Sequence, residues 1–232
     1  MMAGLLSTSL LAGAIALLVC QPAVAGDVAA AASKTGNFMT TATLAAQPVA
    51  TAVSAFLPAG HIEIARGPVT VDGERAELVR YRRSDGRNAA LGGEHFSTVI
   101  AENGRLKGFT RMDLDLVGGQ LPSRKETQAI AMDFLRAAAP DLLPALEISW
   151  IEPHDEPLRA TRNGRTEDLT LTGMKVKMRN KADGRWMWVI VGTDRKVLVF
   201  ERDIVWVTFP GHRKTEKWLH DAWLAENGVS LL

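Results

Sequence analysis

The chain has 232 residues, of which 47% are hydrophobic and 23% are charged. This composition is typical of a folded protein of one or two domains and excludes an intrinsically disordered chain. Lysine and arginine number 27 while aspartate and glutamate number 26, so the formal net charge is only +1. Because so balanced a charge gives no net attraction to nucleic acid or anionic lipid, we expect no nucleic-acid partner.

The first 25 residues are typical of a secretory signal peptide. They carry no charged side chain, include an apolar run from Leu10 to Val19, and end in Ala-Val-Ala. Cleavage is predicted after Ala25, which would make the protein periplasmic or secreted, although the Lys or Arg usual near the start is absent. Gln21-Pro22 ends the run short of the ~20 apolar residues that a membrane-spanning helix needs, so no span is expected after signal removal.

Cys20 is the only cysteine, and it raises the alternative of a lipid-anchored form that begins at this residue. Such sites have a small residue before the cysteine, whereas this chain has Val19, so cleavage after Ala25 is preferred. The mature chain would then contain no cysteine. We therefore expect neither a disulfide nor thiolate chemistry.

The mature chain divides by composition. Residues 26–58 are rich in Ala and Thr and are predicted to be a flexible lead outside the fold. Residues 59–121 contain short apolar runs separated by Gly, Asp and Asn, which predicts an N-terminal β-rich unit. Asn103-Gly104 is the clearest turn signal, because it lies between two predicted strands.

Residues 122–209 are predicted to form a unit of one helix followed by a β-meander. Ser123 and Glu126 have the spacing of a capping box, and Pro140 bounds the helix. The apolar residues at helical spacing are Ile130, Ala131, Phe134, Leu135 and Ala138. This single apolar face predicts a helix that lies on a sheet.

The strands expected after the helix are EISWI, LTLTGMKVKMR, RWMWVIV and KVLVFERDIVWVTF. In the second of these, the apolar phase changes at Gly173, which predicts a β-bulge. Both phases of RWMWVIV are apolar, which predicts a central strand buried on two sides rather than a ligand-stacking surface. Residues 210–232 are predicted to form an amphipathic closing helix with Trp218, Leu219, Ala222 and Trp223 on one face.

Two segments resemble each other within the chain. TVIAENGRLKGFTRMD and WVIVGTDRKVLVFERD share Val-Ile, a polar turn, an Arg, an apolar run and a final Phe, Arg and Asp. A duplicated unit would give this match. Any two hairpins with one buried face would give a weaker version of it, so both explanations stay open.

The helix SRKETQAIAMDFLRAAAPDL, with EISWI, MKVKMRN and DGRWMWVIVGTDRKVLVF after it, resembles the PepSY domain. The match extends over roughly residues 75–207, and Asp183-Gly184 with Val189, Val191 and Val197 correspond to the family's closing hairpin. The family's last turn has Thr-Gly, whereas this chain has Thr193-Asp194-Arg195-Lys196. The resemblance implies an α+β fold, an antiparallel sheet packed by one main helix, as in tandem PepSY-like repeats of exported bacterial envelope proteins. It also implies a non-catalytic module that binds or restrains a peptidase.

Four residues are candidates for chemistry: His95, His154, Asp155 and Glu156. The last three lie in WIEPHDEPLR, where two prolines forbid the helix that would place two zinc ligands on one face. This segment is therefore predicted to be an exposed charged loop, His95 a solvated residue at a strand edge, and His220 a surface residue of the closing helix. No nucleophile elbow, zincin motif or phosphate-binding loop is present, so no catalytic residue, metal or cofactor is predicted.

The leading hypothesis is an exported envelope protein that acts by binding an envelope protein or a peptidase at a sheet edge or beside the helix. The first alternative is a metal-dependent or acid–base hydrolase built from the four candidates. The second is a structural or lipid-carrying envelope protein, which would have an apolar cavity between helix 123–139 and the sheet.

Overall fold

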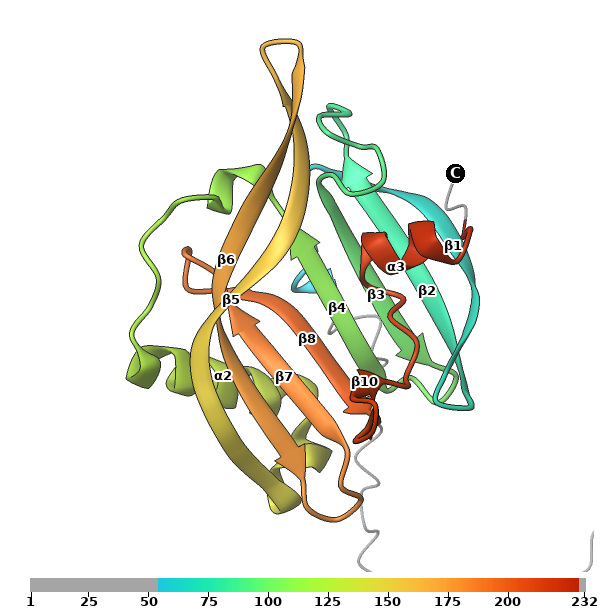
Figure 1. The fold of residues 1–232 in the computed structure, drawn as a ribbon, viewed down its shortest axis with the longest axis vertical. Coiled ribbons are helices and arrows are strands. Elements are labelled where there is room, and N and C mark those ends of the chain that lie inside the picture. The colour runs from blue at the N-terminus through green and yellow to red at the C-terminus, as the bar shows by residue number, and fades with distance from the viewer. Residues whose placement is uncertain (1–53, 230–232) are drawn as a thin grey trace, which may run out of the picture. The chain divides into compact units, whose positions relative to one another are not determined.

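The computed structural model describes residues 54–229, all within the second of the two units into which the chain divides, Ala45–Leu232. The predicted signal peptide, Cys20 and most of the 26–58 lead lie outside the described residues. Most of the described chain is an antiparallel sheet of eight strands in the order β1-β2-β3-β4-β8-β7-β6-β5 (Figure 1). The strands are β1 (His61–Val71), β2 (Glu74–Arg83), β3 (His95–Ala101), β4 (Leu106–Met112), β5 (Leu146–Arg162), β6 (Arg165–Asn180), β7 (Trp186–Val191) and β8 (Val197–Ile204).

The remaining elements are few and short. They are η1 (Leu114–Leu116), α2 (Arg124–Ala138), η2 (Pro140–Ala145), the two-stranded hairpin β9 (Trp206–Val207) and β10 (His212–Arg213), and α3 (Asp221–Glu226). Within residues 54–229, none of the helices has the length and apolar character needed to cross a membrane.

The sheet consists of two four-stranded meanders that are joined through their last strands. β4 pairs with β8 in antiparallel register, and Phe109 lies opposite Phe200. Gly108 lies opposite Glu201, where a Cβ atom would come within 2.5 Å of the Phe200 carbonyl oxygen. The close approach of the two strands therefore requires glycine at this position.

The capping box at the start of α2 is confirmed. The Ser123 hydroxyl accepts from the Glu126 N–H, and the Glu126 carboxylate accepts from the Ser123 N–H. Ala131, Phe134 and Leu135 of this helix are buried in one apolar cluster with strand residues that include Phe109 and Phe200. The interface between α2 and the sheet is thus filled by side chains, which counts against a lipid cavity there.

The prediction of a central, doubly buried strand is confirmed for β7, which lies between β8 and β6. Met187, Val189 and Val191 belong to the cluster that contains the α2 side chains, whereas Trp188 and Ile190 belong to a second apolar cluster. Since successive side chains of a strand point to opposite faces, the two clusters lie on opposite sides of the sheet.

The predicted bulge at Gly173 is wrong. The β5–β6 register runs without a shift through Gly173, and the irregularity lies instead between Ile148 and Trp150. The apolar residues change from odd to even positions along β6 because the two ends of this long strand pack against different apolar clusters, on opposite faces of the sheet. Leu171 packs in the second cluster, whereas Val176 packs on the α2 side.

The predicted loop at WIEPHDEPLR is also wrong, because the whole segment lies within β5. This strand is an edge of the sheet, and its Pro153 and Pro157 need no ladder partner on the open side. The far half of β5 also reaches the first meander. The Arg159 N–H donates to the Gly92 carbonyl at 2.7 Å, and the Thr161 N–H donates to the Asn88 side-chain oxygen at 2.7 Å.

The closing helix is shorter than predicted, because α3 begins at Asp221 and Trp218 and Leu219 precede it. Leu219 and Leu224 are buried, so the segment packs back on the body as expected. Trp218 is fixed by a hydrogen bond from its indole N–H to the Thr70 carbonyl on β1 at 2.8 Å. Residues 218–220 therefore contact the sheet in place of forming the first turn of the predicted helix.

We predict that Phe109→Ala lowers the free energy of unfolding by about 3–5 kcal/mol, because a fully buried ring at the seam is replaced by a cavity. Chemical denaturation measures the loss. Phe209→Ala is the matched control, since Phe209 is exposed and its removal should change stability by less than about 0.5 kcal/mol. Equal effects of the two substitutions would contradict the seam as the centre of the core.

Candidate functional site

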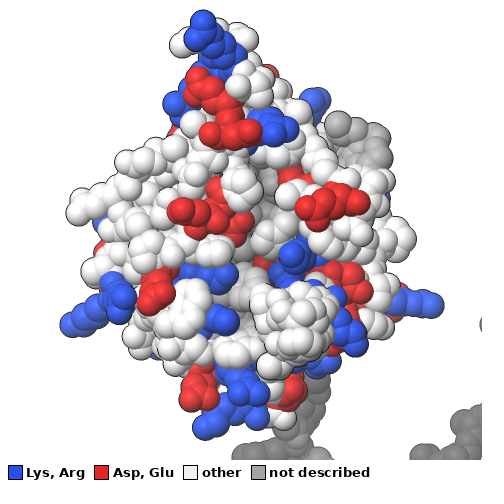
Figure 2. All heavy atoms as spheres, viewed as in Figure 1, with Lys and Arg blue, Asp and Glu red and all other residues white. Residues whose placement is uncertain are grey.

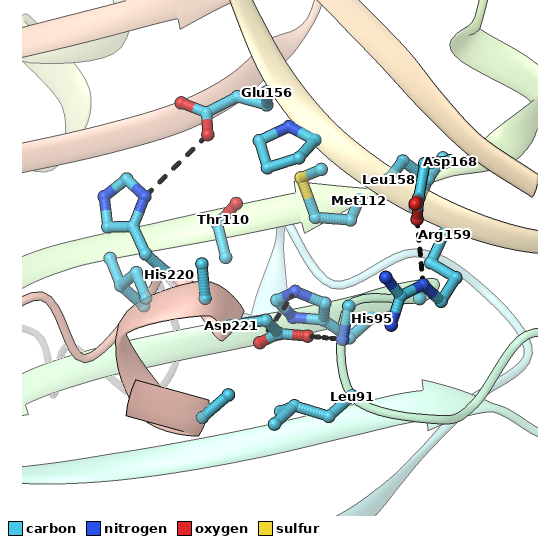
Figure 3. A pocket seen from close by; sticks show the side chains of 16 residues that line it. Leu91, His95, Thr110, Met112, Glu156, Leu158, Arg159, Asp168, His220 and Asp221 are labelled. Carbon is cyan, nitrogen blue, oxygen red and sulfur yellow. Dashed lines mark hydrogen bonds and ion pairs between the residues drawn. The ribbon is translucent and has the colours of Figure 1, made fainter. Parts of the chain in front are cut away.

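A pocket of about 610 Å³ lies on the face of the sheet opposite α2, between β3, β4, the far half of β5 and α3 (Figure 3). Its apolar wall includes Met112, Leu158 and Leu219. Its ionisable residues are His95, Glu156, Arg159, Asp168, His220 and Asp221. The pocket therefore combines apolar surface with a small number of polar groups, as ligand sites do.

The loop before β3 forms one rim of the pocket and is held by a buried carboxylate. Glu94 accepts two hydrogen bonds from the Arg87 guanidinium, one from the Asn88 amide and one from the Leu114 N–H. Burial by itself would raise the pKa of Glu94, but these donors lower it below its usual value. A Cβ atom at Gly93 would overlap the Asn88 carbonyl oxygen at 1.9 Å, so the loop closes only with glycine there.

His95 lies at the base of the pocket and is buried, contrary to the predicted solvated position. Its Nδ1 is 2.9 Å from the Ser97 hydroxyl, and its Nε2 is 3.5 Å from the Asp221 carboxylate. Asp221 also receives two hydrogen bonds from the Arg80 guanidinium, at 2.6 and 2.8 Å, and one from the Gly92 N–H at 2.6 Å. The first residue of α3 is thus bound to β2, to β3 and to the rim loop.

Ser97, His95 and Asp221 are the residue types of a nucleophile–base–acid set, yet their surroundings oppose that chemistry. Ser97 is 1% exposed and is absent from the pocket wall, so a substrate in the pocket does not reach its hydroxyl. Burial, with the charge of Arg80, lowers the pKa of His95 to about 3. A neutral imidazole with so low a pKa is a weak general base, since efficient bases have a pKa near the working pH.

His220 lies between two acidic residues. Its Nε2 is 2.9 Å from Glu201, and its Nδ1 is 3.8 Å from Glu156. Glu201 is buried and also accepts from the Arg213 guanidinium at 2.7 Å and from the Trp188 indole at 3.0 Å. Burial by itself would lower the pKa of His220, but Glu201 and then Glu156 raise it. The predicted surface position of His220 is therefore wrong, because its ring is an ion-pair partner inside the site.

Glu156 and Asp168 are pocket carboxylates with unused hydrogen-bonding capacity in the described part of the chain, and of these two only Glu156 is buried. Glu156 is 7% exposed, and its oxygens form ion pairs with His154 at 3.4 Å and His220 at 3.8 Å, while the buried Lys175 also interacts with its charge. In Figure 3, its side chain lies across the pocket from Asp221. A buried acceptor of this kind is stabilised when a ligand donates a hydrogen bond to it.

Of the four predicted candidates, the structure brings His95 and Glu156 into one pocket. His154 is on the same strand as Glu156 and contacts it, but its Nε2 also lies 3.5 Å from Lys175, whose pKa burial lowers to about 8. Asp155 points to the other face, where it accepts from the Thr172 hydroxyl at 2.7 Å. Strand periodicity explains this separation, because residues 154 and 156 share a face that residue 155 does not.

The polar residues that sequence reasoning missed are Arg80, Glu201 and Asp221. For Glu201 the signal is a charge after the apolar run VLVF of β8, since such a charge is buried only with a partner. Arg80 and Asp221 carry no comparable signal, because Arg80 lies in a strand with several charges and Asp221 begins a short helix. Figure 2 shows basic and acidic side chains interspersed on this face, without a large area of one sign. Within residues 54–229, no three His, Cys, Asp or Glu residues are placed to hold a metal ion together.

We predict that Glu201→Gln lowers the free energy of unfolding by about 3 kcal/mol, because it leaves Arg213 and His220 without their buried counter-charge. Urea denaturation measures this loss. Glu167→Gln, at an exposed position of β6, removes the same charge and should be nearly neutral. A loss of similar size in both variants would show that the buried pairs are not responsible.

We also predict a pH dependence from the raised pKa of His220. The protonated ring stabilises the folded state fully below the unfolded pKa of 6.5, and this contribution is lost as pH rises through the higher folded pKa. The free energy of unfolding should therefore fall above pH 6.5 more steeply in the wild-type protein than in His220→Gln. Urea titrations of both proteins at several pH values measure the difference, and parallel curves would contradict the assignment.

Comparison of the chain with models of known protein families, with curated proteins and with solved structures finds no match. No relative therefore supplies residue roles for the pocket, and the resemblance to the PepSY domain stays a prediction.

Proposed function

We propose that this chain is an exported, non-catalytic protein of the cell envelope that binds a protein partner, such as a peptidase, through the pocket beside α3. The observation that carries the proposal is Glu156, a buried carboxylate that faces an apolar-walled pocket and receives no hydrogen bond from the described chain. A partner segment that offers a hydrogen-bond donor to this carboxylate and an apolar group to Leu158 would satisfy both features.

The arrangement of the two meanders supports a duplicated, PepSY-like organisation. Phe134 of α2 packs against Phe200 at 5.0 Å between ring centroids, and Phe56 stacks on Phe109 at 5.3 Å. Phe109 and Phe200 are register partners at the seam, and each has its shortest ring contact with a ring from the segment before its own meander, although Phe134 also contacts Phe109 at 5.8 Å. This correspondence favours duplication over two unrelated hairpins.

An acid–base hydrolase is the second candidate, because His95 and Glu156 line one pocket. It predicts turnover of peptide, ester or phosphate substrates that is lost in both His95→Ala and Glu156→Gln. The binding proposal predicts no such turnover. Assays of the purified chain on these three substrate classes therefore separate the two functions.

The partner can be identified by a photo-crosslinking amino acid placed at Ala222, whose side chain lines the pocket. We expect adducts with a defined envelope protein, identified by mass spectrometry. The same crosslinker at Asp133, an exposed position of α2, is the control for the opposite face. Identical adducts from both positions would count against a pocket-specific partner.

For the partner identified by crosslinking, we predict that Glu156→Gln weakens its binding about tenfold. This is the equivalent of one lost charged hydrogen bond of about 1.4 kcal/mol. Isothermal titration calorimetry measures the affinity. Asp155→Asn is the matched control, because it removes a neighbouring negative charge that points away from the pocket and should leave affinity unchanged. Equal losses in the two variants would indicate a general charge effect and refute the role of Glu156.

A further inference from the structure

The β9–β10 hairpin presents aromatic side chains to solvent outside the main sheet. Phe209 is 90% exposed and Trp206 is 50% exposed, and only Ile62, at 44%, joins them among the exposed large hydrophobic residues of the described chain. Pro210 and Gly211 complete the exposed turn after Phe209. Two exposed aromatic residues on so short a hairpin form an apolar tip, by which we mean Trp206 and Phe209, and exposed apolar groups of this kind are typical of an interaction site.

The base of this tip is fixed to the body. The Lys214 N–H donates to the Val205 carbonyl at 2.9 Å, and the Val205 N–H donates to the Thr215 hydroxyl at 2.8 Å. Arg213 anchors the second strand through its hydrogen bond to the buried Glu201. The hydrogen bonds fix the backbone on which the exposed residues are carried, so little backbone conformational entropy is lost when the tip binds.

The hairpin segment itself carries no acidic residue, although the whole chain is nearly neutral. Residues 204–215 contain no aspartate or glutamate but include His212, Arg213 and Lys214. His212 and Lys214 are exposed. Glu216 is the next acidic residue along the chain, and its carboxylate accepts a hydrogen bond from the Asp72 N–H at 2.9 Å. Arg213 is paired with the buried Glu201, so Lys214 is the exposed cation of this segment. Exposed aromatic residues beside an exposed cation are complementary to a surface with an apolar interior and an anionic exterior.

We propose that the β9–β10 hairpin inserts Phe209 and Trp206 into the interface of an anionic lipid bilayer. Aromatic rings favour the level of the headgroups, and cations beside them bind anionic lipid. A lipid surface suits the tip better than a protein, because Phe209 is 90% exposed at the turn, whereas protein hot spots lie inside a surrounding rim of contacts. This contact goes beyond the proposed function, since it places the protein at a membrane without involving the pocket.

A label at the tip tests the proposal in the full chain. Cys20→Ser removes the only native thiol, and Phe209→Cys then carries an environment-sensitive fluorophore. The readout must be local, because the apolar run 10–19 can itself hold the chain on vesicles. Ile62→Cys, labelled in the same way, is the matched control, since Ile62 is an exposed apolar residue beside the acidic Glu63.

With phosphatidylglycerol vesicles, we expect a blue shift and an increase in emission of about twofold or more from the label at residue 209, and neither from the label at residue 62. Phosphatidylcholine vesicles should give a smaller response. Lys214→Gln in the Phe209→Cys protein should weaken the response to anionic vesicles and reduce its sensitivity to salt.

The proposal would be overturned if the protein sediments with the vesicles but the emission spectrum of the label at residue 209 does not change. A response at residue 209 only upon addition of envelope proteins, with none from lipid alone, would overturn it in favour of a protein partner at the tip. Both outcomes leave the pocket hypothesis intact, because crosslinking at Ala222 tests that separately.

Discussion

The pairing of β4 with β8 is the constraint on which the rest of the structure depends. It joins two four-stranded meanders into one sheet and places Phe109 opposite Phe200. Nearly every residue of β4 and β8 is buried, and because successive side chains of a strand point to opposite faces, both faces of these strands are covered. α2 contributes to an apolar cluster on one face, and the C-terminal segment lies on the other, where Glu201 of β8 is buried.

The two faces of the sheet are covered by segments that are held by different kinds of interaction. Between α2 and the sheet, aromatic and aliphatic side chains fill the space, and their burial stabilises the fold without regard to direction. The C-terminal segment is held instead by directional contacts: Asp221 with Arg80, and His220 and Arg213 with Glu201. Desolvation offsets much of the attraction in such pairs, so their main effect is to define one position for the segment rather than to add stability.

The sequence predicted features that arise from local pattern. The capping box at Ser123, the doubly buried β7 and the turn at Asn103-Gly104 all appear where expected. It failed where a long-range contact decides the outcome. The segment WIEPHDEPLR of β5 contains two prolines and was predicted to be a loop, yet an edge strand tolerates both of them. His95 and His220 read as solvated residues because their partners, Asp221 and Glu201, are 126 and 19 positions away along the chain.

The pocket follows from these directional contacts. Apolar contacts alone would let α3 settle until the space beneath it closed, since a void in an apolar interface forfeits dispersion energy. Asp221 and His220 instead bind groups that project from paired strands, and the strands fix the distance of α3 from the sheet. A change that weakens these contacts should therefore alter the shape of the pocket before it unfolds the α2 side, because α3 has fewer buried apolar contacts to retain it.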